Sequence, residues 1–405
     1  MNADWLEITL GEVATLQRGF DLPQQNRKLG NIPIISSSGK TDTHNEARVT
    51  APGVVTGRYG TIGQVFFIEE DFFPLNTTLW VKDFHGNEPH FVYYLLKTLD
   101  FQQFNDKSSV PGINRNHVHL YKVCLPPLET QKKIASILGA LDDKIELNRR
   151  TNATLETIAQ TLFKSWFVDF DIVKAKALGL EPKGVDAATA ALFPSAFVSS
   201  SMGEIPEGWE VKEIGDEVNL FGGGTPSTTE PKYWENGMHA WVTPKDLSGV
   251  QEPVLLKTER KITTAGLSTI TSGVLPIGTV LMSSRAPIGY MAISQIPISI
   301  NQGFIAMVCN ARLSNYFVLN WAKEHMETIV GRANGSTFLE VSKKNFRSIP
   351  LVVARDEVLV AFDKLVAPIY ETIVANTRET VSLATTRDFL LPKLLSGELD
   401  VGNLV

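Results

Sequence analysis

The chain is poor in cysteine and has no long apolar run. Its 405 residues include only two cysteines, Cys124 and Cys309, and each stands alone in an apolar segment. A disulfide framework and a cysteine zinc site are therefore not expected. No stretch approaches the roughly 18 consecutive apolar residues that span a bilayer, and the opening MNADWLEITL does not resemble a signal peptide. We expect a cytoplasmic protein with no membrane partner.

Positive charge is also in short supply. The chain has 38 Lys and Arg against 44 Asp and Glu, a net charge of −6. This balance excludes a protein that coats any polyanion. It leaves open a nucleic-acid reader whose basic side chains gather on one face. The length corresponds to about two or three domains.

Catalytic signatures are missing as well. The sequence contains neither H-E-x-x-H nor G-x-S-x-G, and its seven histidines are scattered. His117 and His119 would share one face of a strand, which leaves a metal pair open; a polar surface or a DNA-facing loop is the favoured alternative. We predict no catalytic residue and no metal site in this chain.

What the sequence does contain is an internal repeat. Trp5 opens the first half and Trp209 the second, and the apolar runs GVVTGRYGTIGQVFFI and GTVLMSSRAPIGYMAI occupy the same place in the two halves. Aligned in this way, Arg58 matches Arg285 and Asn76 matches Asn301. Many short β-type runs separated by Gly and Pro, with one or two helices in each half, predict an α+β fold.

After each β-rich half the apolar period changes from two to about 3.6, which predicts a long helix with a coiled-coil seam. We expect domains at 1–127, 205–350 (both β-rich), 128–170 and 351–405 (both helical), with a linker at 171–204. Helices of roughly 35 residues would be about 50 Å long, whereas one turn of B-DNA is about 34 Å. The predicted seam residues are Ile134, Leu141, Asn148, Leu155, Phe362, Ile369, Ile373, Asn376 and Leu383.

Polar side chains on turns between the predicted strands are candidate DNA contacts. Arg forks onto guanine, Asn and Gln pair with adenine, and Lys holds phosphates. Arg58 and Arg285 rank first because both halves place an Arg there, although a shared structural role is an alternative. Neither half is basic overall, so binding by the chain alone should be weak and salt-sensitive. The candidates are Lys40, Arg58, Tyr59, Asn76, Arg115, Lys245, Arg285, Asn301, Gln302, Lys343 and Lys344.

Six short motifs occur in a characteristic order along the chain. They are LPPLETQKKIASIL (125–138), IPEGWE (205–210), FGGGTPS (221–227), YWENG (233–237), WVTPKDLS (241–248) and LLPKLLSGEL (390–399). Together with the duplication and the two heptad helices, they resemble the specificity (S) subunit of type I restriction-modification enzymes. The resemblance covers nearly the whole chain.

The resemblance implies two α/β target recognition domains separated by two long antiparallel coiled-coil-like helices, with pseudo-twofold symmetry. Each domain would read one half of a split site in double-stranded DNA, and the helices would set the spacing. Two modification subunits would supply S-adenosylmethionine-dependent adenine methylation, and restriction subunits would use ATP and Mg. The chain itself would carry no cofactor and no catalysis. A protein-binding scaffold without DNA readout, or a stand-alone nuclease with an unrecognised site, is the alternative.

The two halves also depart from each other. The first half lacks the Ile-Pro-x-Gly lead, and QRGFDLP stands where the second half has Gly-Gly-Thr-Pro. The two halves are therefore expected to read different half-sites.

Overall fold

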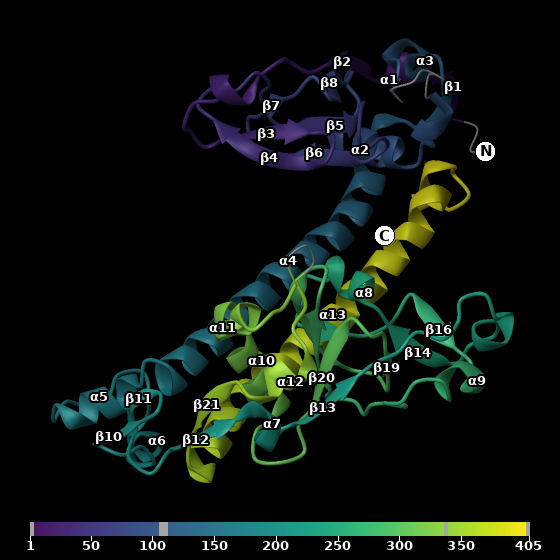
Figure 1. Ribbon diagram of the computed structural model, residues 1–405. Helices are drawn as coiled ribbons and strands as arrows, with labels where there is room; N and C mark the ends of the chain where they lie inside the picture. Colours follow the sequence, from purple (N-terminus) through teal and green to yellow (C-terminus); the bar gives the residue numbers. More distant parts are fainter. Residues whose placement is uncertain (1–3, 105–111, 336–338, 402–405) are drawn as a thin grey trace. The chain divides into compact units, whose positions relative to one another are not determined.

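The computed structural model describes residues 4–104, 112–335 and 339–401 (Figure 1). Its internal contacts divide the chain into two compact units. The first unit contains Met1–Ile145 and Val381–Val405, and the second contains Glu146–Thr380. The division falls within both long helices, so each unit holds a β-rich part and a piece of each helix.

The first unit contains two sheets and a separate strand pair. The larger sheet has the order β2-β8-β5-β6, the smaller has the order β4-β3-β7 with β3 and β7 parallel, and β1 pairs with β9. The strands are β1 (Leu6–Thr9), β2 (Thr15–Arg18), β3 (Ile32–Ser36), β4 (Gly39–His44), β5 (Gly53–Gly57), β6 (Val65–Ile68), β7 (Phe73–Pro74), β8 (Thr78–Asp83) and β9 (Lys122–Leu125). The short helices are α1 (Leu10–Val13), η1 (Gln24–Asn26), α2 (Pro89–Lys97), η2 (Phe101–Phe104) and α3 (Arg115–His119).

The second unit repeats this plan. Its larger sheet has the order β13-β20-β17-β18-β15, its smaller sheet has the order β16-β14-β19 with β14 and β19 parallel, and β12 pairs with β21. The strands are β12 (Glu210–Glu213), β13 (Asn219–Gly222), β14 (His239–Val242), β15 (Val254–Leu255), β16 (Arg260–Ile262), β17 (Val280–Ser284), β18 (Ile288–Ser294), β19 (Ser299–Ile300), β20 (Phe304–Val308) and β21 (Pro350–Val353). The helices between them are α7 (Ile214–Glu217), η3 (Pro231–Tyr233), α8 (Pro244–Ser248), α9 (Thr264–Leu267), α10 (Asn315–Glu324), α11 (Met326–Gly331) and α12 (Lys343–Arg347).

The predicted internal repeat and the α+β class are confirmed by these strand orders. In each unit four strands of the larger sheet, all three strands of the smaller sheet and the separate pair follow one another in the same sequence. The second unit differs by one added edge strand, β15, which runs parallel to β18.

Two helices of 40 residues each follow the β-rich parts: α4 (Leu128–Phe167) and α13 (Asp356–Leu395). At about 1.5 Å per residue each is about 60 Å long. Within the second unit they run antiparallel, since Asn152 of α4 meets Thr377 of α13 and Phe163 meets Phe362 farther along. Both predicted helices are therefore present.

The predicted seam residues lie in three kinds of surroundings. Ile134 is buried in the core of the first unit, and Leu141 and Leu383 are half-buried. Phe362 and Ile373 are fully buried in the core of the second unit, against which Leu155 and Ile369 pack. Asn148 and Asn376 belong to a polar layer of the helix pair. This layer also contains Asn152, Thr377 and Thr380, which the heptad pattern did not single out.

In the polar layer, side-chain amides and hydroxyls pair with one another. Asn148 is 3% exposed and donates through Nδ2 to Glu379 Oε2 at 2.8 Å. Asn376 Nδ2 donates to Asn152 Oδ1 at 2.9 Å, and Asn152 is itself buried. A buried amide is tolerated where its hydrogen bonds are made. The polar residues of one helix therefore need their partners at these positions of the other helix.

The segment 171–204, predicted as a linker, is folded. It forms α5 (Asp171–Ala177), α6 (Ala187–Ala191) and the hairpin β10 (Phe197–Ser200) with β11 (Gly203–Pro206). Ile172, Val173 and Phe193 are buried in the core of the second unit. The Ala, Ser and Gly content suggested a linker, but these three apolar side chains have enough buried area to hold the segment in place.

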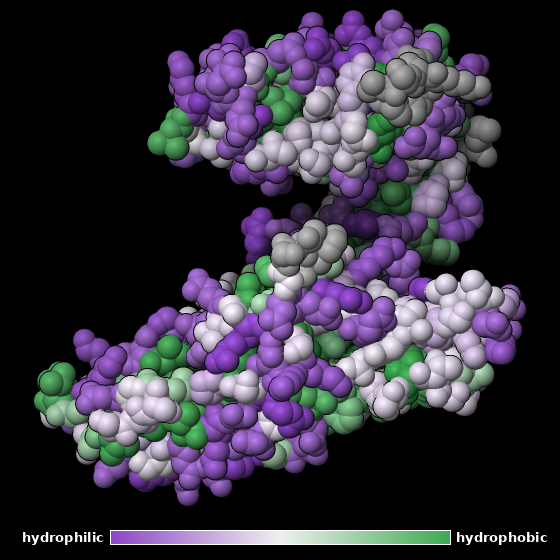
Figure 2. Space-filling model, viewed as in Figure 1, coloured by the Kyte–Doolittle hydropathy of each residue, from purple (hydrophilic) through white to green (hydrophobic). Residues whose placement is uncertain are grey.

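Each unit has its own hydrophobic core. In the first unit, Phe91 and Tyr94 of α2 pack with Leu10 and with Leu394 of α13. In the second, the rings of Phe163, Phe317 and Phe362 pack edge to face. On the face that Figure 2 shows, hydrophilic side chains cover most of the first unit, and apolar ones form separate patches. None of the described helices combines the length and apolarity needed to cross a membrane.

Candidate nucleic-acid interface

The strand pairings show which residues of the two units are equivalent. The N–H groups of Arg58 and Ser284 occupy the same place, each donating at 2.8 Å to a carbonyl of the loop that precedes β8 or β20. The following residues, Tyr59 and Arg285, then each form an isolated bridge to the segment before α3 or α12. Arg285 is therefore the equivalent of Tyr59, and the alignment of Arg58 with Arg285 is wrong by one residue.

The same correction applies to the predicted asparagine pair. The N–H of the first β8 residue donates to the carbonyl of Leu75, and the N–H of the first β20 residue donates to that of Asn301. Leu75 and Asn301 are thus equivalent, and Asn76 corresponds to Gln302. The alignment of Asn76 with Asn301 is therefore also wrong by one residue. Asn76 and its true equivalent, Gln302, nevertheless both carry an amide side chain.

A cation does recur in both units, at a different position. Arg115 and Lys343 are each the first residue of a short helix, α3 or α12, and follow the N-caps Asn114 and Ser342. Both side chains are exposed. Because the two units keep a cation here on the same backbone, this pair replaces Arg58 and Arg285 as the repeated candidate.

In the first unit the backbone brings several candidates to one edge. Arg58 and Tyr59 both donate through their N–H groups to Thr77 O, next to Asn76, and Arg58 O accepts from Ile113 N, two residues before Arg115. The guanidinium of Arg58 lies 4.4 Å from the centre of the Tyr59 ring. The hairpin that carries Lys40 reaches the same edge, since a Cβ on Gly60 would lie 3.2 Å from Ser37 Oγ.

The second unit gathers its candidates at the equivalent edge. Ser284, next to Arg285, is hydrogen-bonded through its N–H to the loop that carries Asn301 and Gln302, and through its carbonyl to Val341, close to Lys343. The start of α8 also touches this loop: a Cβ on Gly303 would lie 3.1 Å from Pro244, which precedes Lys245. Lys344 is exposed on α12.

Glycine allows the closest approach at both edges. A Cβ on Gly223 would lie 1.9 Å from Ile300 O, and one on Gly19 would lie 2.2 Å from Leu75 O. The two glycines are equivalent, so QRGFDLP and FGGGTPS share the one glycine that this contact requires. The residues that follow, Asp21 and Thr225, then face the amides of Asn76 and Gln302.

Three candidate cations are ion-paired. Lys40 Nζ lies 3.5 Å from Glu70, Lys245 Nζ lies 2.9 Å from Glu259 Oε2, and Arg285 Nη1 lies 3.4 Å from Glu340. The Glu259 carboxylate raises the pKa of Lys245 above its usual value through a hydrogen bond and charge attraction. The Lys40 and Lys245 pairs are largely solvent-exposed, and the Arg285 pair is partly exposed. Exposed ion pairs are weak, so a phosphate can compete with each carboxylate.

A comparison with models of known protein families decides the family. The family model described as the type I restriction modification DNA specificity domain matches the chain twice, over residues 2–157 and 206–357. The chain belongs to this family. The resemblance found from the motifs is thereby confirmed.

Relatives within the family cover most of the chain. The type I restriction enzyme HindI specificity subunit of Haemophilus influenzae is 27% identical over 388 residues, which is 83% of this chain and 84% of the relative. The MjaIX specificity subunit of Methanocaldococcus jannaschii is 26% identical over 327 residues, covering 79% and 71%. The crystal structure of an S subunit from M. genitalium has a TM-score of 0.61 at 16% identity and covers 97% of this chain and 96% of its own; it supports the fold alone.

Some polar residues at the edges of this specificity-domain protein were missed from sequence. Thr225 lies in FGGGTPS, which marked the resemblance, and Asp21 lies in QRGFDLP, which marked the departure of the first half; neither residue was considered as a contact. Arg260 was also missed; its guanidinium lies 3.6 Å from the centre of the Trp234 ring. For Thr225 a signal was available in the motif FGGGTPS, but it becomes specific only once the folded sheet places it beside Gln302. Arg260 lies outside the motifs, and only strand pairing places it beside Trp241.

The histidine pair has a structural place in this member of the family. His117 and His119 lie in the helix α3 and not on a strand. His119 Nε2 accepts a hydrogen bond from Leu16 N at 2.9 Å, and burial, with a smaller effect of Arg115, lowers the pKa of His119. The equivalent Arg347 also packs on a helix glycine of its unit, Gly215, but it donates through Nη1 to Gly215 O at 3.0 Å. Within the described residues, no three His, Cys, Asp or Glu side chains come together as metal ligands would.

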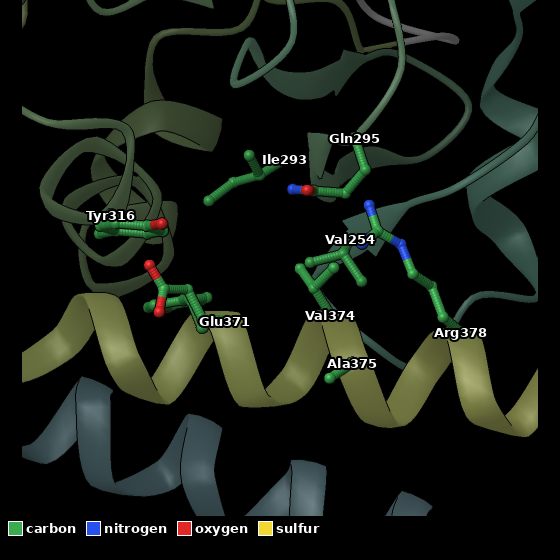
Figure 3. A pocket seen from close by; sticks show the side chains of 9 residues that line it. Val254, Ile293, Gln295, Tyr316, Glu371, Val374, Ala375 and Arg378 are labelled. Carbon is green, nitrogen blue, oxygen red and sulfur yellow. The ribbon is translucent and has the colours of Figure 1, made fainter.

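A separate hollow of about 270 Å³ lies in the second unit beside α13. Figure 3 shows Tyr316, Glu371, Gln295 and Arg378 around it. Burial and the Glu371 charge raise the pKa of Tyr316. The hollow contacts β18 at Ile293, whereas the turn beside Arg285 is at the other end of the β17–β18 pair. It is therefore not part of the candidate DNA edge.

Proposed function

We propose that this chain is the DNA specificity subunit of a type I restriction-modification complex. One observation carries the proposal: a single chain contains two units of the same topology whose equivalent edges carry different polar side chains. Such an arrangement suits a target made of two unlike half-sites, each read by one unit. The membership of the chain in the specificity-domain family and the names of its relatives support the same function.

The two long helices set the distance between the half-sites and provide the surfaces on which two modification subunits bind. A continuous α-helix changes length by about 1.5 Å per residue, so its length translates directly into spacing. Restriction subunits complete the complex. S-adenosylmethionine, ATP and Mg belong to these partners, and the chain alone is non-catalytic in this proposal.

The charge of the chain supports a division of binding between subunits. Its exposed cations at the two edges are few, and three of them are already ion-paired. Phosphate contacts supply most non-specific affinity for DNA. The chain alone should therefore bind DNA weakly, and the modification subunits should add contacts.

The decisive experiment is to co-express the chain with the modification subunit of its own system and map methylated adenines in the host DNA. We expect one bipartite motif with a fixed gap. Replacing residues 4–127 by the corresponding part of a relative should change one half of that motif only. Methylation without a split motif, or a chimera that alters both halves, would contradict the proposal, as would DNA cleavage by the purified chain with Mg²⁺.

A matched pair of variants separates a DNA reader from a protein-binding scaffold. Charge reversal at Arg58 and Arg285 should abolish sequence preference if the edges contact DNA. A scaffold should tolerate both changes and still assemble with its partners. Charge reversal at Lys212, which pairs with Glu210 on β12 away from these edges, is the control.

A further inference from the structure

Each unit has an amide side chain at the same place of its candidate edge. In the first unit it is Asn76, and in the second it is the equivalent Gln302. An amide has one end that donates and one that accepts, and the two ends look alike except in their hydrogen bonds. The partners of each amide therefore decide which end is left to face a ligand.

In the first unit a carboxylate engages the donor end. Asn76 Nδ2 donates to Asp21 Oδ1. Asp21 is held in turn by Arg18, whose Nη2 lies 3.0 Å and 3.1 Å from the two carboxylate oxygens. An ionised carboxylate can only accept, so the amide cannot turn over without losing this bond. Asn76 Oδ1 has no donor within hydrogen-bond distance among the described residues, and it is left as a free acceptor.

In the second unit a backbone group fixes the opposite arrangement. Gly303 N donates to Asn301 Oδ1 at 2.7 Å, and a backbone N–H has no acceptor function. The other end of Asn301, Nδ2, therefore donates to Thr225 Oγ1 at 2.8 Å. The Gln302 atom that lies 3.2 Å from this Nδ2 donor must be an acceptor, so it is Oε1. The Thr225 hydroxyl donates to the same oxygen.

Gln302 is thus held by its oxygen and presents its Nε2 amide as a donor. The residue is exposed, and no partner of Nε2 occurs within the described part of the chain. The two units place amides at equivalent positions with opposite hydrogen-bonding polarity. The difference comes from the neighbouring residue, Asp21 in one unit and Thr225 in the other.

We propose that Asn76 reads a base amino group in one half-site and that Gln302 reads a base acceptor in the other. The inference rests on the proposed function. In the major groove the amino donors are adenine N6 and cytosine N4, whereas the acceptors are guanine O6 and N7, adenine N7 and thymine O4. Asp21 and Thr225 are positioning residues, since each fixes the polarity of an amide without being the proposed reader.

The sharpest test inverts one reader. Gln302→Glu keeps an oxygen for Thr225 and Asn301 and replaces the Nε2 donor by a second acceptor. The full chain, bound to its modification subunits, is used to select duplexes from a library randomised across both half-sites. At one position of one half-site the preference should move by roughly tenfold or more away from guanine and thymine, which offer only acceptors there, and toward the bases with an amino group, cytosine through N4 or adenine through N6. The other half-site should not change.

Two further variants complete the design. Asp21→Asn replaces an obligate acceptor by an amide that can donate to Asn76, so Asn76 can present either end. Preference at one position of the other half-site should weaken several-fold. Gln295→Glu is the matched control: it makes the same chemical change in the second unit, beside the hollow of Figure 3, and should leave every base preference intact.

The outcomes separate the inference from the function beneath it. Selection of unchanged bases by Gln302→Glu, with only a uniform loss of affinity, overturns the inference and leaves the proposed function standing. A wild-type complex that selects no bipartite sequence overturns both. Retention of the unaltered half-site by each variant shows that the chain has folded and assembled.

Discussion

In each unit a short 3-10 turn, η1 or η3, packs against an edge strand of the smaller sheet, β4 or β16. The side chains that make this contact differ between the two units. In the first unit, Arg27 after η1 forms an ion pair with Asp42 on β4, with 2.8 Å between Nη1 and Oδ2. At the equivalent places of the second unit, Trp234 follows η3 and Arg260 stands on β16, stacked on the indole. A charge pair in one unit has become a cation over an aromatic ring in the other.

This difference shows which features the repeat keeps. The strand order is the same in both units, and the register differs only at local bulges. Each unit also keeps a glycine ahead of β3 or β14, Gly30 or Gly237, that packs directly on β4 or β16. The side chains that cross the gap differ completely in chemistry. Shared geometry with exchanged side chains is what two readers of unlike half-sites require, so we expect the two units to be separable in stability and in DNA binding.

The largest effect should come from the cores. Phe91 on α2 and Phe317 on α10 are equivalent, and both are almost fully buried. Truncating either to alanine should cost about 3–5 kcal/mol of unfolding free energy, because a ring-sized cavity is left. In calorimetry, Phe91→Ala should lower one transition and Phe317→Ala another. If either variant lowers both transitions equally, the two units unfold as one.

A smaller effect is expected for the repeated cation. Arg115→Gln and Lys343→Gln should each weaken binding to specific and scrambled duplexes alike, because a phosphate contact carries no sequence information. Each should also reduce the slope of log affinity against log salt by about 1. The measurement is a salt titration of DNA binding by the assembled complex.

Lys344→Asn is the natural control for this prediction. It introduces the residue that the first unit has at the equivalent position, Asn116, where no cation is needed. The change in slope should be clearly smaller than for Lys343→Gln. Equal slopes for the two lysine variants would show that α12 contributes only diffuse charge.

The smallest effect concerns pH. Burial raises the pKa of Asp363 above its usual 3.8, although a hydrogen bond from Ser314, the N-cap of α10, opposes the shift. An acid whose pKa is raised by folding favours the folded state below its unfolded pKa, and this contribution is lost as pH rises through the folded value. Asp363→Asn should therefore gain stability relative to the wild type over that rise.

The first unit supplies the internal control for the pH prediction. At the start of its equivalent helix α2, the backbone N–H of the N-cap Glu88 donates to an uncharged side chain of α4, Gln131 Oε1, at 3.0 Å. Thermal unfolding of the wild type and of Asp363→Asn from pH 3 to pH 7 tests the prediction. A constant difference across that range would mean that Asp363 does not titrate as the structure implies.

The sequence predicted the repeat, the α+β class and both long helices because periodicity and motif order extend over many residues. The prediction of which single residues of the two halves are equivalent was less accurate. Arg58 was aligned with Arg285 by residue identity, whereas hydrogen bonding to the preceding loop places Arg285 opposite Tyr59. Arg115 and Lys343 were both candidates, but their equivalence was hidden because the two loops that lead to them have too few identical residues to align.

Other errors came from reading composition instead of pairing. The segment 171–204 has the small residues of a linker, yet Phe193 and its neighbours belong to the core. His117 and His119 were placed on a strand, although Asn114 caps a short helix there through its side chain. The polarity of Asn76 and Gln302 could not be predicted, because it depends on residues about 55 and 77 positions away that only the folded sheets bring close.

The polar layer of the helix pair has a consequence for how such a protein can change its spacing. If α4 slid by one turn along α13, Asn152 would move from Thr377 to Ile373 in one direction, or Asn148 would move from Glu379 and Thr380 to Leu383 in the other. In either case one amide would be buried without its present partners. That costs about 1–3 kcal/mol for each stranded amide. The layer therefore fixes the register of the two helices relative to each other. Insertions or deletions that alter the gap must add or remove whole turns on either side of it, leaving the asparagines matched.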